Sequence, residues 1–149
     1  MMKLLIASLL ISTSLGIYSS IASAVTMPCS MVLEPVEQNL PNAKGAALVY
    51  QVQLRPPSFA RTNISILGVH LPMPSSYGNY DSYEGFAFIP DQISWRFPLY
   101  VTDDNHVWAG KFDEITASLD EAEVQIRLSN SKTKKLGPSV LGRKINECK

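Results

Sequence analysis

Apolar and polar side chains alternate along much of the chain, and this two-residue period predicts β-strands with one buried face. The segment 123–130 places Val124, Ile126 and Leu128 on one side and polar side chains on the other. The segment 91–102 repeats the pattern with larger apolar residues. We therefore expect both segments to be strands that bury one face against a core.

Two further segments have less regular patterns. The segment 46–55 ends at two prolines, and its apolar face carries Leu48 and Tyr50. The segment 63–73 has apolar residues of both parities, which fits a strand covered on both faces or a strand shifted in parity by a bulge. A bulge near Gly68 is the preferred interpretation.

Three more strand candidates, at 30–38, 106–115 and 138–147, bring the expected number to about seven. The interval 113–124 has a poor helical stripe, so we expect at most a single turn there. Short strands separated by turn residues predict an all-β fold, and specifically an antiparallel β-sandwich with immunoglobulin-like architecture. The cysteine pattern of immunoglobulin domains is absent, so this expectation concerns architecture alone.

The first 24 residues have the composition of a secretory signal peptide. Lys3 supplies a positive charge, residues 4–11 form an apolar core, and Ala22-Ser23-Ala24 is a small-residue cleavage site. A membrane anchor is the alternative, but serines and a threonine interrupt the apolar run that spanning would need. We expect cleavage to leave residues 25–149 as one domain without membrane insertion, in a secreted or periplasmic location.

The chain contains two cysteines, Cys29 and Cys148, near the two ends of the expected mature domain. An oxidising compartment favours a disulfide between them, although free thiols or a bond between two chains are alternatives. A bridge requires Cα atoms about 4.4–6.8 Å apart. If it forms, the first and last segments of the domain are neighbours in space.

The charge balance and the metal-ligating residues narrow the possible functions. Acidic residues number 13 and basic residues 13, and one of the basic residues is Lys3 in the signal peptide, so the mature chain is nearly neutral. This balance gives no electrostatic reason to expect nucleic acid or an anionic membrane surface as a partner. His70 and His106 lack metal-ligand spacing, and residues 103–105 lack the regular alternation of a calcium loop. We expect no metal and no cofactor.

The stretch 75–88, SSYGNYDSYEGFAF, is the best candidate binding surface in the sequence. Tyr77, Tyr80 and Tyr83 stand among Ser, Gly, Asn and Asp, a composition that binding loops of β-sandwich domains often use. The alternative is that the three tyrosines fold back and cap the core.

No nucleophile elbow or other catalytic motif occurs in the chain. We therefore expect an exported, non-enzymatic binding domain that recognises a protein or a glycan at the cell surface or in the periplasm. The alternatives are a structural subunit of an exported assembly or, less favoured, a small secreted hydrolase.

Overall fold

The computed structural model describes residues 25–53, 59–102 and 106–147. They form eight strands and two 3-10 turns, namely β1 (Cys29–Pro35), β2 (Lys44–Gln53), β3 (Ala60–Val69), η1 (Pro74–Tyr77), β4 (Ser82–Ile89), β5 (Ile93–Val101), β6 (Trp108–Ile115), β7 (Glu123–Ser129), β8 (Leu136–Lys144) and η2 (Ile145–Glu147). Within these ranges no helix is long and apolar enough to cross a membrane.

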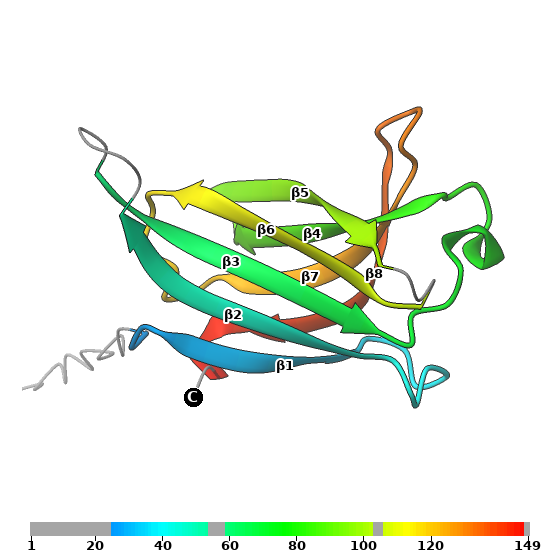
Figure 1. Cartoon of the computed structure of the whole chain (residues 1–149), viewed down its shortest axis with the longest axis horizontal. Coiled ribbons are helices and arrows are strands. Elements are labelled where there is room, and N and C mark those ends of the chain that lie inside the picture. The colour runs from blue at the N-terminus through cyan, green and yellow to red at the C-terminus, as the bar shows by residue number, and fades with distance from the viewer. Residues whose placement is uncertain (1–24, 54–58, 103–105, 148–149) are drawn as a thin grey trace, which may run out of the picture.

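The strands close into a barrel in the order β1-β2-β3-β6-β5-β4-β7-β8, and every neighbouring pair is antiparallel. Figure 1 shows β1, β2, β3 and β6 side by side in that order, with β4, β7 and β8 behind them. We call β1, β2, β3, β6 and the end of β5 wall A, and β4, β5, β7 and β8 wall B. The core lies between the two walls.

The all-β, antiparallel prediction is confirmed, but the structure differs from an open sandwich of about seven strands. Two short ladders join the walls. β1 pairs with β8 at Glu34 and Pro35, and β5 pairs with β6 at Tyr100 and Val101. Because both corners are hydrogen-bonded, the sheet has no long free edge.

The strand missing from the sequence prediction is β4, which begins at Ser82 inside the tyrosine stretch. Its inward positions are Tyr83, Gly85, Ala87 and Ile89. Gly85 and Ala87 contribute little apolar area, so the alternation was weak. A side chain at Gly85 would meet the Phe97 ring at 2.3 Å, and the ring therefore fills the space that glycine leaves.

Two local expectations were also wrong. β2 buries Ala47 and Val49, whereas Leu48 points outward. The irregularity in β3 falls between Thr62 and Ile64 rather than near Gly68. Leu48 in β2 and Leu67 in β3 are therefore apolar residues on the outer surface of the barrel.

Candidate functional site

Tyr83 lies in the core of the barrel and is 0% exposed. Its hydroxyl donates to the Pro72 carbonyl oxygen at 2.9 Å, and its ring packs edge-on against Trp108 at 5.2 Å between centroids. Burial, with a smaller contribution from nearby Tyr77, raises the pKa of the Tyr83 phenol. Tyr83 thus has no surface to offer a partner in the folded barrel.

Tyr77 and Tyr80 are half-buried and pack against the core from the connection between β3 and β4. Burial, and then the nearby charge of Glu37, raise the pKa of Tyr77. Tyr80 lies so close to Gly137 that a Cβ there would stand 2.5 Å from its ring. The structure therefore gives all three tyrosines packing roles at one end of the barrel.

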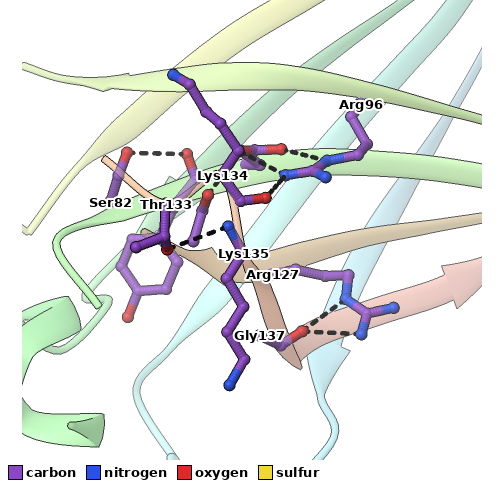
Figure 2. Close-up of polar contacts among 10 residues, drawn as sticks. Ser82, Arg96, Arg127, Thr133, Lys134, Lys135 and Gly137 are labelled. Atoms are coloured by element: carbon purple, nitrogen blue, oxygen red, sulfur yellow. Dashed lines mark hydrogen bonds and ion pairs between the residues drawn. The ribbon is translucent and has the colours of Figure 1, made fainter. Parts of the chain in front are cut away.

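The outer face of wall B carries Phe86 and Phe88 among polar side chains, several of which form hydrogen bonds with one another or with the backbone. Arg96 donates to both carboxylate oxygens of Glu84 at 2.8 and 3.0 Å, and Ser129 donates to one of them at 2.5 Å. Arg127 donates twice to the Gly137 carbonyl oxygen, as Figure 2 shows, and its guanidinium lies 5.1 Å from the Phe86 ring centroid.

The turn between β7 and β8 extends this polar face. Arg96 also donates to the Lys134 carbonyl oxygen at 3.2 Å, which ties the turn to β5 (Figure 2). Lys134 adopts a left-handed backbone with φ of 59°. The turn that carries Lys132, Lys134 and Lys135 is thus held to wall B by its backbone.

The outer face of wall A is different, because an apolar residue from each of its five strands falls in one lateral row. In the strand register, each residue of this row is paired with the next one on the neighbouring strand. The exposed fractions of its three largest members are 54% for Val32, 43% for Leu67 and 68% for Tyr100. We call this set the apolar row; its members are Val32, Ala46, Leu67, Ala109 and Tyr100.

Polar groups lie on both sides of the apolar row, interspersed with the apolar residues Val69 and Leu48. On one side Lys44 forms an ion pair with Glu34. On the other side Ser65 lies between Leu48, which is 44% exposed, and Lys111, which bonds Asp113 at 2.7 Å. An apolar centre within a polar rim is the usual anatomy of a protein-protein contact.

Sequence reasoning missed the apolar row, although a signal for it was present. The mixed parity of 63–73 reflects an inward face and an exposed apolar face, and Leu67 belongs to the second. The same is true of Leu48 in β2. Alternation alone could not reveal which face of these strands is buried.

The described residues are 25–53, 59–102 and 106–147. There, no group of three or more His, Cys, Asp or Glu side chains stands ready to hold a metal ion. Residues 103–105 lie outside the described ranges. The His106 Nδ1 atom stands 3.1 Å from the Leu71 carbonyl oxygen, so this ring helps to hold the connection between β3 and β4.

Cys29 begins β1 and is 4% exposed. Cys148 lies outside the described residues, so its pairing with Cys29 stays a prediction. In the antiparallel register of β1 and β8, Glu34 faces Gly142. Earlier residues of β1 therefore run toward the end of β8, and Figure 1 shows β1 beside β8.

Comparison with known proteins gives a family. No solved structure matches the chain. A Bacillus subtilis (strain 168) protein described as "SPbeta prophage-derived uncharacterized protein YoqH" is 62% identical over 128 residues, which cover 85% of each chain. The profile of the family with that same description matches residues 25–149. The chain belongs to the YoqH family.

Proposed function

We propose that this chain is an exported, non-enzymatic binding domain that contacts a protein partner through the apolar row of wall A. The observation that carries the proposal is the register, because it aligns five outward apolar residues across five adjacent strands. Contiguous exposed apolar surface with a polar rim is typical of interaction sites. Single, scattered apolar residues on a protein surface do not indicate an interaction site.

Burial of apolar surface stabilises a complex by about 25 cal/mol per Å², before the costs of association are subtracted. Val32, Leu67 and Tyr100 are each about half exposed or more in the free chain. They stand on strands held on both sides by neighbours, so little conformational entropy is lost when they bind. Wall B offers less, since Glu84, Arg96 and Arg127 on its outer face already have hydrogen-bond partners.

The chemistry of the apolar row favours a protein over a glycan. Four of the five members have Val, Leu or Ala side chains, which form no hydrogen bonds, and only Tyr100 offers a hydroxyl. A glycan would bury hydroxyl groups against them without partners, at a cost of about 1–3 kcal/mol for each group. An apolar patch on another protein meets the same surface without that cost.

Export and disulfide formation belong to the same proposal. The N-terminal pattern supports cleavage after Ala24, and the family match starts at the next residue, Val25. The direction of β1 against β8 supports a Cys29–Cys148 bond. In this proposal the mature domain works outside the cytoplasm.

A structural subunit is the second candidate, because the apolar row could also bury itself against a second copy. Donation of an N-terminal strand is disfavoured. Val25 and Met27, which precede β1, pack against the core of their own barrel. Any assembly would have to form face to face.

A photo-crosslinking amino acid at Ala46, in the centre of the apolar row, tests the proposal in the exporting cell. We expect a covalent adduct that mass spectrometry identifies as one partner protein. The double substitution Val32→Lys and Leu67→Lys should abolish the adduct, because two desolvated charges would face the partner.

Met73→Lys is the matched control, since Met73 is 50% exposed but lies outside the apolar row. It should leave the Ala46 adduct intact. An adduct of twice the chain mass would favour the structural subunit over a separate partner. An adduct that survives the double substitution would overturn the proposed contact surface.

A further inference from the structure

The backbone nitrogen of Val25, the first described residue, donates to the Asp120 Oδ1 atom at 2.9 Å. This bond joins residues 95 positions apart. The second carboxylate oxygen, Oδ2, accepts from the Ser118 hydroxyl at 2.6 Å. Asp120 is therefore oriented by its own turn, with one oxygen aimed at the Val25 nitrogen.

The connection between β6 and β7 holds this carboxylate in place. The Ala122 amide donates to the Leu119 carbonyl oxygen at 3.0 Å, which closes the turn around Asp120. Leu119 is 1% exposed and anchors the turn in the core. The position of the acid thus follows from core packing.

Among the described residues, few other charged side chains lie near the Val25 nitrogen. A cavity of about 480 Å³ adjoins it, bordered by β2, β3 and the segment after β6. The charged side chains among its lining are Asp120 and Arg61. The Arg61 guanidinium donates to the Phe59 and Ala60 carbonyl oxygens at 3.2 and 3.3 Å.

Signal-peptide removal would change the chemistry of this nitrogen. A peptidase of the export machinery hydrolyses the Ala24–Val25 bond: water supplies the hydroxyl that completes the Ala24 carboxyl group and the proton that completes the Val25 amine. An α-amino group has a pKa of about 7.7–8.0, so it is largely protonated at neutral pH. A nitrogen with one N–H then becomes an ammonium with three donors.

We propose that Asp120 is the binding site for the α-ammonium of the mature chain, so that cleavage converts a hydrogen bond between a neutral amide and a carboxylate into an ion pair. The ammonium adds an attraction between opposite charges that the neutral amide donor lacks. Cleavage would thereby fasten the segment that leads into β1 to the β6–β7 turn. The lowered pKa of Asp120, caused by the Ser118 hydroxyl and then the Val25 amide, agrees with a carboxylate that is ionised at neutral pH. The inference rests on the export included in the proposed function.

The test uses the secreted protein, whose N-terminal residue is first determined by sequencing. We expect Val25. Reductive methylation with carbon-13 then labels the α-amine, and NMR follows its titration. In the wild type its pKa should lie above the value of about 7.7–8.0 for free N-termini. Asp120→Asn should return it to that range.

Asp113→Asn is the matched control, because it removes one negative charge from a carboxylate that bonds Lys111 instead. It should leave the α-amine titration unchanged. A second arm compares chains that begin at Val25 and at Ala24. Asp120→Asn should lower the Tm more in the first, where Val25 carries the charge.

Equal titration in the wild type and Asp120→Asn would overturn the inference, as would a mature chain that starts at another residue. Neither result would affect crosslinking through the apolar row. Loss of that crosslink, in turn, would leave the Val25 titration unchanged. The two proposals therefore fail separately.

Discussion

Tyr83 decides how the tyrosine stretch is to be understood. Its ring is fully buried against Trp108, and its hydroxyl bonds the Pro72 carbonyl oxygen. We expect Tyr83→Ala to lower the free energy of unfolding by about 3–5 kcal/mol, as other aromatic-to-alanine changes in cores do. Tyr83→Phe should lower it by about 1 kcal/mol, through loss of the hydrogen bond alone.

Tyr100→Ala is the comparison for this prediction, because Tyr100 is 68% exposed on wall A. Its effect on stability should stay within about 0.5 kcal/mol. Urea unfolding followed by intrinsic fluorescence measures all three variants. Equal stability of Tyr83→Ala and wild type would show that Tyr83 does not support the core.

The residues themselves could not indicate which tyrosines are buried. Tyr83 and Tyr100 both lie in strands. Tyr83 follows a serine and Tyr100 follows a leucine, and neither neighbour indicates which face of the strand is buried. Tyr83 points inward together with the residues that it pairs with on the two neighbouring strands, Leu99 on β5 and Leu128 on β7. That information is held in strand pairing, which a single sequence does not display.

At the scale of elements, Glu84 connects β4 to both of its neighbouring strands in wall B. Its carboxylate accepts from Arg96 on β5 and Ser129 on β7. Burial alone would raise the pKa of Glu84, but the hydrogen bonds from Arg96 and Ser129 outweigh it, and the net shift is downward. The ionised form is thus the one that the folded barrel favours.

A lowered folded-state pKa stabilises the protein above the unfolded pKa, about 4.3 for glutamate, and this stabilisation disappears as the pH falls through the folded-state value. We expect Glu84→Gln to cost about 1 kcal/mol at pH 7, since the Arg96 pair is partly exposed. The difference from wild type should shrink steadily below pH 4.3. Urea unfolding at several pH values measures it. A difference that is constant with pH would contradict the role of the Glu84 charge.

The same element shows where strand prediction succeeds and fails. β7 was predicted correctly because Val124, Ile126 and Leu128 are large, apolar and all inward. β4 was missed because two of its inward positions are Gly85 and Ala87. In β4 the partner strand supplies the missing volume, so the pattern is completed only in three dimensions.

At the scale of the whole molecule, closure of the barrel depends on few residues far apart in the chain. The β1–β8 ladder contains Glu34 and Pro35, and the β5–β6 ladder contains Tyr100 and Val101. Local alternation predicts strands but carries no information on such distant pairs. For that reason the strands could be predicted from the sequence, whereas the barrel and the apolar row that it presents could not.

Closure of the barrel leads to the last prediction. Because β1 and β8 are neighbours, the main effect of a bond between Cys29 and Cys148 would be to restrict the unfolded chain. We expect reduction of the secreted protein to lower the free energy of unfolding by about 4–5 kcal/mol, the chain-entropy value for a closed loop of roughly a hundred residues. Thiol titration of the denatured, unreduced chain should find no free thiol. The double variant Cys29→Ala and Cys148→Ala is the control, and its stability should not respond to reductant. Two titratable thiols per chain in the secreted protein would show that barrel closure alone holds the ends of the domain together.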